Sequence, residues 1–568
     1  MKDREGDGYL KSSSVTFWMS RSLFRHMKFR GLWLFLSFAL VAMLGYWLAA
    51  TAVPRKAPRA ASAGIPETPR RTLMTDEEMP KFRRGERNPA STNDDKAADA
   101  GALENQRVLV FKDQAALNRF LERAGERIRL MGRLDALNAL RVGFSDYGDL
   151  LALLDGSEEQ SFVFPVNVPD LPQGGVQPGA VALGNHLLKW LGISGDNSAW
   201  GKGVRIAILD TGVTSHSAFS GAIRTFNLVD LPADLSLQNG HGTAVASFIL
   251  GNDSFTPGVA PGAEVYSYRI ADDNGQSNSY LLAQGIVAAA DARVPIVVIA
   301  MGSSGDSSLV RNAIAYAMER GVMIVAAAGN NGINQVSYPA ANDGVIAVGA
   351  VDALGNHLEF SNSGNEIAIS APGYGLNAAW TDDRAASVSG TSFSAPIVGG
   401  LIAALMTEAG RGNLTAPQAW KLLTAYLNDG GAAGVDPELG AGMPDIGRVL
   451  TGTTPGVYDA ALASQRILPP DAGNPYGQVE ILVQNRGTET LVNTSVRVSA
   501  AGRETVVNLT SIAPDAVRTI RVPVTQPPSA ETSGFTIDSR VVLGGGLKDI
   551  QPSNDRRVET YDPTGNPF

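Results

Sequence analysis

The chain has 568 residues, of which 44% are apolar and 18% charged, so it is long enough for several globular domains. The absence of cysteine excludes disulfides, a thiol nucleophile and thiolate metal sites. The net charge of -9 argues against nucleic acid as a partner, because nucleic acid selects clustered lysine and arginine.

A charge-free apolar run stands near the N-terminus, from Gly31 to Val53. At about 1.5 Å per residue, this run can span the roughly 30 Å hydrocarbon core of a bilayer. The basic segment before it, residues 1–30, favours export of everything that follows. Small residues at 50–52 offer a cleavage site, so residues 31–53 are interpreted as a signal peptide or a signal anchor. Both alternatives predict a periplasmic or extracellular protein, and an uncleaved run would anchor it in the inner or plasma membrane.

Residues 54–103 carry prolines, charges and small polar residues without apolar periodicity, which predicts a disordered linker. The pattern changes in residues 104–170, where Leu117 and Phe120 lie at a helical spacing between strand-like runs. The order strand, helix, strand, strand, helix, strand is typical of a small ferredoxin-like α+β unit.

Residues 186–452 contain short runs rich in valine and isoleucine that alternate with helical patterns, such as VRIAILD, PIVVIAM and VMIVAAAG. Strands of nearly continuous apolar character are typical of a parallel sheet covered on both faces. This region is therefore predicted to be an α/β domain with a doubly wound, mainly parallel sheet.

In residues 457–562 the helical patterns stop, and strand-like runs such as QVEILVQN and ETVVNLTSI follow one another with turn residues between them. This spacing predicts an antiparallel β-sandwich at the C-terminal end of the chain.

Three polar residues of the α/β region stand where chemistry is expected. Asp210 ends a strand pattern, at the edge where α/β folds place active sites. His241 and Ser392 each open an apolar, helix-like run, whose N-terminus offers unpaired N–H groups. A serine hydroxyl needs a neighbouring general base, and that base needs an orienting carboxylate. The set predicts Ser392 as nucleophile, His241 as base and Asp210 as the orienting group.

Asn330 follows another strand pattern, and its amide can donate a hydrogen bond to an oxyanion beside the N–H of Ser392. Each motif also has a purely structural interpretation. Asp210 and Asn330 are suited to turns, and His241 and Ser392 to helix starts. The occurrence of all of them in order, each in its fitting context, favours catalysis.

The motifs AILDTGV, NGHGTAVAS, AAAGNNG and GTSFSAPIVGG resemble those of the subtilisin (subtilase) family of serine proteases over about residues 190–450. The chain order Asp, His, Ser is also that of subtilisin. The resemblance implies a subtilisin-like fold, triad roles for Asp210, His241 and Ser392, and an oxyanion role for Asn330.

The resemblance also implies substrate-binding residues. Met301, Gly302 and Ser303 correspond to the family's substrate-binding strand, and Ser337 to a position in the wall of the S1 pocket. Family members often carry a second histidine where this chain has Ala244, a change that removes no triad group.

Residues 104–170 resemble the family's inhibitory propeptide, which assists folding and is then cut off. We therefore expect a cut between about Val166 and Asn185. Residues 457–562, with VQNRGTETLVNTSVRV, resemble adhesion modules of the CARDB type, which implies binding or packing.

Together these features predict an exported serine endopeptidase, made as a self-processing zymogen, that hydrolyses peptide bonds through an acyl-enzyme. Its predicted partners are protein or peptide substrates and its own propeptide, together with the membrane if residues 31–53 are retained. Catalysis is expected to need no cofactor, and a structural calcium ion is neither indicated nor excluded. The alternative is a catalytically weak adhesion or scaffolding protein that uses a protease-like chassis.

Overall fold

The structure is a computed structural model, and it describes residues 100–170, 176–229, 239–407, 413–468, 477–500, 502–523 and 535–561. The predicted segments 1–30 and 31–53 lie outside these ranges, as does nearly all of the predicted linker 54–103. Among the residues that are described, no helix is both long enough and apolar enough to cross a membrane.

The first described unit is an antiparallel sheet with two helices. Asp113 begins its longer helix by accepting a hydrogen bond from the N–H of Ala116 at 2.7 Å, and Leu117 and Phe120 of that helix are buried. The strands lie in the order β2-β3-β1-β4. In chain order the elements are β1 (Gln106–Val110), α3 (Gln114–Ala124), β2 (Arg129–Leu134), β3 (Ala139–Gly143), α4 (Tyr147–Leu151) and β4 (Glu159–Ser161).

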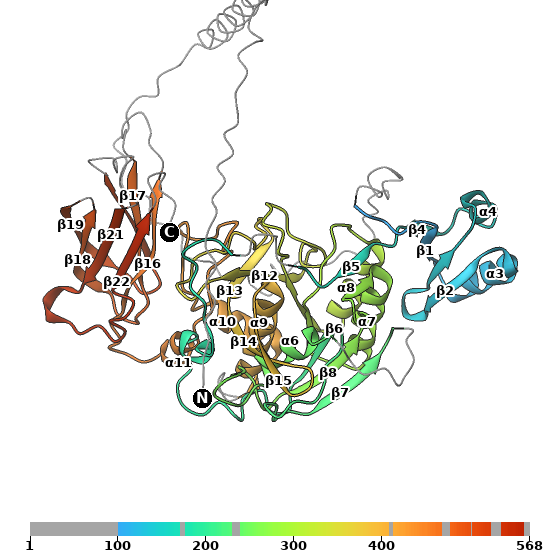
Figure 1. The fold of residues 1–568 in the computed structure, drawn as a ribbon, viewed down its shortest axis with the longest axis horizontal. Helices are drawn as coiled ribbons and strands as arrows, with labels where there is room; N and C mark the ends of the chain where they lie inside the picture. Colours follow the sequence, from blue (N-terminus) through green and yellow to red (C-terminus); the bar gives the residue numbers. More distant parts are fainter. Residues whose placement is uncertain are drawn as a thin grey trace, which may run out of the picture. The chain divides into compact units, whose positions relative to one another are not determined.

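The centre of the protein is a seven-stranded sheet in the order β13-β12-β11-β10-β6-β8-β7, and every neighbouring pair is parallel (Figure 1). This confirms the predicted doubly wound α/β domain. The strands are β6 (Arg205–Asp210), β7 (Ile223–Asn227), β8 (Glu264–Arg269), β10 (Ile296–Ile299), β11 (Met323–Ala327), β12 (Val345–Val351) and β13 (Ile367–Pro372).

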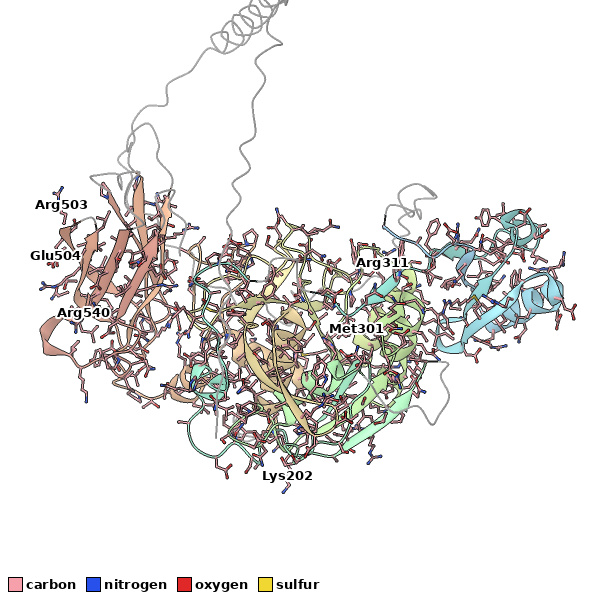
Figure 2. The ribbon with its side chains drawn as sticks, in the orientation of Figure 1. Lys202, Met301, Arg311, Arg503, Glu504 and Arg540 are labelled. Atoms are coloured by element: carbon pink, nitrogen blue, oxygen red, sulfur yellow. The ribbon has the colours of Figure 1, made fainter. Side chains whose placement is uncertain are left out.

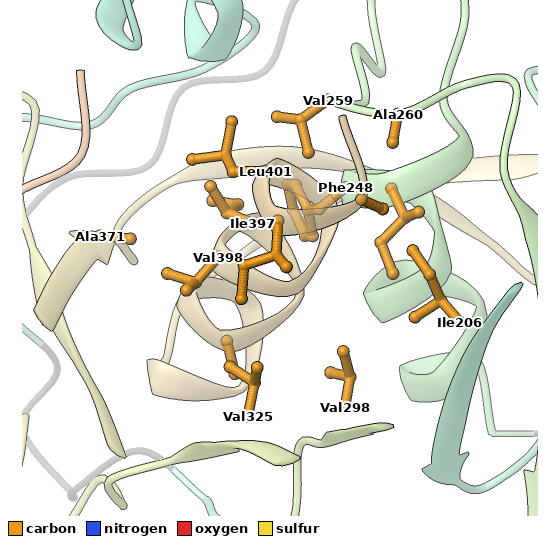
Figure 3. Packing of buried hydrophobic residues seen from close by; sticks show 14 of the residues in the cluster. Ile206, Phe248, Val259, Ala260, Val298, Val325, Ala371, Ile397, Val398 and Leu401 are labelled. Carbon is orange, nitrogen blue, oxygen red and sulfur yellow. The ribbon is translucent and has the colours of Figure 1, made fainter. Parts of the chain in front are cut away.

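Helices cover both faces of this sheet, because successive side chains of each strand point to opposite sides. In β6, Ile206 packs with α6 (His241–Leu250) and α9 (Thr391–Leu405). Its neighbour Ala207 packs with α7 (Ser279–Asp291) and α8 (Ser308–Met318). Figure 3 shows the first of these cores, where Ile397, Val398 and Leu401 of α9 lie among side chains of the sheet such as Val298 and Val325.

Smaller elements complete this domain. Among them, β5 and β9 pair with each other, as do β14 and β15. The elements are β5 (Pro165–Asn167), α5 (Leu187–Trp190), β9 (Gln276–Asn278), β14 (Leu376–Trp380), β15 (Arg384–Val388), α10 (Ala416–Thr424) and α11 (Ile446–Thr451).

The C-terminal part is built from two antiparallel sheets, β16-β17-β20 and β19-β18-β21-β22, whose inward residues form one apolar core. Val483, Val496 and Ile537 are fully buried in that core. The strands are β16 (Ala460–Leu468), β17 (Gln478–Asn485), β18 (Leu491–Ala500), β19 (Arg503–Ile512), β20 (Val517–Pro523), β21 (Phe535–Val542) and β22 (Arg556–Tyr561).

A cluster of polar side chains, here called the joint, links this sandwich to the α/β domain. Gln484 of β17 accepts a hydrogen bond from the N–H of Asp429 at 3.0 Å and donates to the carbonyl oxygen of Leu427 at 3.1 Å. Arg448 of α11 donates to the same Leu427 oxygen at 2.6 Å and pairs with Asp515. The Gln484 side chain is buried, so the joint satisfies polar groups that belong to both domains.

Candidate active site

Asp210 is the last residue of β6 and is fully buried. Its Oδ1 accepts hydrogen bonds from the N–H of Thr211 at 2.7 Å and from the Thr211 hydroxyl at 3.2 Å. The backbone is held as well, since the N–H of Ile270 donates to the Asp210 carbonyl at 2.9 Å. These hydrogen bonds offset the cost of burying the carboxylate.

His241 is the first residue of α6, and Asn239 holds it there by accepting its backbone N–H at 2.9 Å. The ring nitrogen Nδ1 lies 2.8 Å and 2.9 Å from the two carboxylate oxygens of Asp210. Because a carboxylate only accepts hydrogen bonds, Nδ1 carries a proton, and a neutral imidazole in this tautomer has its lone pair on Nε2. The ring also packs against Phe393 with 5.3 Å between ring centroids, which fixes its plane beside the start of α9.

Ser392 is the second residue of α9 and is almost fully buried. Gly390 allows the sharp entry into this helix. Its φ of 139° lies in the region that favours glycine, and a Cβ there would stand 2.9 Å from Nδ2 of Asn330. The Ser392 hydroxyl donates to the carbonyl oxygen of Ala300 at 3.0 Å. In the described ranges no hydrogen bond joins Ser392 to His241, so the structure brings Asp210 and His241 into contact but leaves the serine on another acceptor.

Asn330 lies just after β11, and its side chain is buried. Its Oδ1 accepts two hydrogen bonds from Thr391, one from the N–H at 2.9 Å and one from the hydroxyl at 2.8 Å. Because Oδ1 is committed to α9, the donor end of the amide is directed away from the helix. That end, Nδ2, donates to the carbonyl oxygen of Pro169 at 3.3 Å.

The segment before Asp170 runs through the site as an extra strand. β5 pairs antiparallel with β9 on one side. On the other side Asn167 and Gly302 exchange two backbone hydrogen bonds, each 2.9 Å long. Further along, Val168 donates to the carbonyl oxygen of Gly275 at 2.9 Å. The segment therefore lies as an extended peptide between two backbone walls and ends at the amide of Asn330.

The predicted strand Met301, Gly302 and Ser303 forms one of these walls. Gly302 contacts the segment, whereas the Met301 side chain is fully buried inside the domain (Figure 2). Ser303 is held by Tyr338, with which it exchanges backbone hydrogen bonds at 2.8 and 2.9 Å. The arrangement leaves the backbone of Gly302 as the group that faces the segment before Asp170.

Ser337 lies beside two glycines that border the site. A Cβ on Gly302 would stand 3.1 Å from the Cβ of Ser337, and one on Gly329 only 2.4 Å from its hydroxyl oxygen. The hydroxyl also accepts a hydrogen bond from the side chain of Asn362 at 3.3 Å. The serine side chain thus occupies space between the wall at 302 and the strand end that carries Asn330.

Several groups of the site were missed from the sequence. The carbonyl oxygens of Ala300 and Gly275 act through the backbone, so no side-chain signal marks them. β9 is only three residues long and carries no apolar alternation. Asn239 lies in the NGHGTAVAS motif, and its place two residues before His241 is typical of an Asx turn, in which the side-chain oxygen accepts a backbone N–H.

In the parts of the chain that the structure describes, no group of three or more histidine, aspartate or glutamate side chains is arranged to hold a metal ion.

Comparisons with known proteins find similarity within the α/β domain. The family model described as "Subtilase family" matches residues 201–442. The thermostable alkaline protease of Halalkalibacterium halodurans is 41% identical over 206 residues, which are 36% of this chain and 57% of that protein. Subtilisin Savinase of Lederbergia lenta is 37% identical over 207 residues, which are 36% of this chain and 76% of that protein. A solved structure, the protease domain of PatA, matches at 32% identity and a TM-score of 0.41, over 45% of this chain and 97% of that one. The chain thus spans little more than half the length of the alkaline protease.

Proposed function

Because the chain belongs to the subtilase family, we propose that it is a serine endopeptidase with Ser392 as its nucleophile. Oγ of Ser392 attacks the scissile carbonyl carbon while Nε2 of His241 takes the hydroxyl proton. Asp210 stabilises the imidazolium through Nδ1. The C–N bond then breaks, the leaving amine takes the proton from His241, and water hydrolyses the acyl-enzyme by the same route. The substrates are proteins or peptides, and the proposal requires no cofactor.

Asn330 serves as an oxyanion donor in this proposal. As the carbonyl oxygen gains negative charge, Nδ2 of Asn330 and the backbone N–H of Ser392 stabilise it. The two hydrogen bonds from Thr391 to Oδ1 support this role, because an amide that is held in place needs no reorganisation during the reaction.

Substrate is bound as an added strand between Gly302 and the loop that contains Gly275. Main-chain hydrogen bonds supply affinity without sequence preference, and side-chain pockets supply the specificity. We assign Ser337 to the side of such a pocket, where it favours small side chains. Met301 and Ser303 contribute through the backbone positions that hold Gly302 in place.

The observation that carries the proposal is the hydrogen bond from Asn330 to the carbonyl oxygen of Pro169. Because Nδ2 of Asn330 is the proposed oxyanion donor, this bond supports the carbonyl of Pro169 as the one that reacts first. We propose that residues 104–170 are the propeptide and that the protein cuts its own Pro169–Asp170 bond. This bond lies inside the expected window between Val166 and Asn185, of which residues 171–175 are outside the described ranges.

Export and anchoring also belong to the proposal. The charge-free run 31–53 would carry the protein across a membrane, either as a cleaved signal or as a retained anchor. The sandwich at 457–562 would bind or pack rather than catalyse.

Labelling with a fluorophosphonate probe tests the central claim, since the probe reacts only with an activated serine. The wild-type chain should be labelled and Ser392→Ala should not. Ser394→Ala is the matched control, because that serine lies on the same helix and binds the carbonyl oxygens of Ala371 and Pro372. A wild-type chain that takes no label even after residues 104–170 have been cut off would favour the adhesion or scaffolding alternative.

A further inference from the structure

The register of the bound segment fixes what its next residue faces. Asn167 and Gly302 form a hydrogen-bonded pair in an antiparallel ladder. The next such pair in a ladder lies two residues further along one strand and two residues back along the other. That pair is Pro169 and Ala300, so an N–H on residue 169 would point at the carbonyl oxygen of Ala300.

Proline has no N–H to give. The Ala300 oxygen instead accepts the hydroxyl of Ser392 at 3.0 Å. Meanwhile His241 stays bound to Asp210 and keeps Nε2 free for a proton. The hydroxyl proton of the proposed nucleophile is therefore directed at a backbone carbonyl that cannot serve as a base.

From this geometry we infer that Pro169 is a latch, which leaves the Ala300 carbonyl open to Ser392 and thereby keeps the serine away from His241. A residue with an N–H at this position takes that acceptor and frees the hydroxyl for His241. The inference rests on the proposed function and extends it. The protein cuts its own segment slowly, and it prefers peptides with any residue but proline before the scissile bond.

Pulse-labelled full-length chains test the latch on the self-cut. Pro169→Ala supplies the missing N–H, so conversion to the shortened chain should be about tenfold faster than in wild type, the size expected for one hydrogen bond. Pro455→Ala is the matched control. It also replaces a proline, but at an exposed position between α11 and β16 that is outside the bound segment, and it should convert at the wild-type rate.

The outcomes separate the two claims. Equal rates for wild type and Pro169→Ala would overturn the latch while leaving the proposed self-cut intact. Rapid cutting of Pro169→Ala beside an uncut wild type would support the latch, and would mean that Pro169 blocks the self-cut completely. If no chain is shortened in a Ser392-dependent manner, the proposed processing fails and the latch fails with it.

Peptides given to the shortened enzyme isolate the N–H itself. Three peptides carry the sequence of Val166 to Val168 followed by alanine, proline or lactate before the bond to be cut. Lactate keeps the alanine methyl but replaces its N–H with an ester oxygen. The kcat for cleavage, followed by mass spectrometry, should be about tenfold lower for proline and for lactate than for alanine. A lactate peptide cut as fast as the alanine peptide would overturn the inference.

Discussion

Thr391 holds the Oδ1 end of Asn330, and in the proposed mechanism the Nδ2 end donates to the oxyanion. A substitution should separate these two roles. Removing an oxyanion donor of this kind typically lowers kcat by about 10²–10³-fold. We therefore expect Asn330→Ala to lower kcat in that range on a peptide substrate and to leave KM nearly unchanged. The reason is that Nδ2 gains its strongest interaction only when the carbonyl oxygen becomes charged.

A suitable control for this measurement is Asn197→Ala. Asn197 is also buried and donates to a backbone carbonyl, that of Gly258 at 2.9 Å, but it lies outside the site. Both variants lose an amide, so only the loss of kcat distinguishes them. An Asn330→Ala enzyme with wild-type kcat would reduce Asn330 to a structural residue at a strand end.

At the scale of single residues, the sequence predicted which side chains belong to the site better than it predicted their hydrogen bonds. Asp210, His241, Ser392 and Asn330 could be found because strand ends and helix starts of an α/β domain meet at one edge of the sheet. The bond from Ser392 to Ala300 could not be found, since it depends on a rotamer and on the pairing of distant backbone segments.

At the scale of elements, α9 is a helix whose described residues are all buried, and its glycines allow close packing. A Cβ on Gly400 would stand 2.4 Å from a methyl group of Val259. We expect Gly400→Val to lower the free energy of unfolding by about 1–3 kcal/mol through overpacking. Urea unfolding of the Ser392→Ala chain, which cannot digest itself in the proposed mechanism, measures this change.

The matched control for this packing is Ala315→Val, on α8. That position is only partly buried, so the same kind of change should stay within about 0.5 kcal/mol. Equal effects for the two substitutions would show that valine disfavours either helix by propensity alone and that Gly400 is not a packing site.

In the sandwich, two carboxyl groups link stability to pH. Burial raises the pKa of Asp459 to about 6, although the hydrogen bond from Asn554 lowers it. Burial and the neighbouring Asp549 raise the pKa of Asp555 to about 7. In an unfolded chain both groups have a pKa of about 3.9. Between about pH 4 and 7 the folded state therefore binds more protons, and the free energy of unfolding falls as the pH rises.

Scanning calorimetry of the Ser392→Ala chain should show this as a sandwich transition with a lower Tm at pH 8 than at pH 5. Asp555→Asn should flatten the dependence, because an amide keeps a donor beside Asp549 and does not ionise. Asp343→Asn, at an exposed position of the α/β domain, should leave the dependence as it is. A pH dependence unaffected by Asp555→Asn would contradict the assignment.

At the scale of the whole molecule, the proposed export can be tested with a fusion protein. A reporter enzyme fused after Leu103 carries the charge-free run and the basic residues before it. We expect its activity only in the exported compartment, because the positive residues stay inside and the run crosses the membrane. Deleting residues 31–53 should return the reporter to the cytoplasm, and cytoplasmic activity of the intact fusion would disprove the prediction.

Composition and periodicity also outlined the large units, because each builds its own apolar core. The joint at Gln484 escaped this reasoning, since its hydrogen bonds link polar residues that are far apart in the chain and follow no period.

The joint bears on how such a protein could be recombined. A graft that moves the α/β domain alone would leave the Leu427 carbonyl and the Asp429 N–H without the Gln484 amide that satisfies both. A graft of the sandwich alone would remove that amide from the α/β domain and would separate Asp515 from Arg448. The natural unit of exchange is thus the pair of domains together, and a chimaera that joins the α/β domain to a new neighbour must supply Gln484, or a side chain that can both donate and accept in its place.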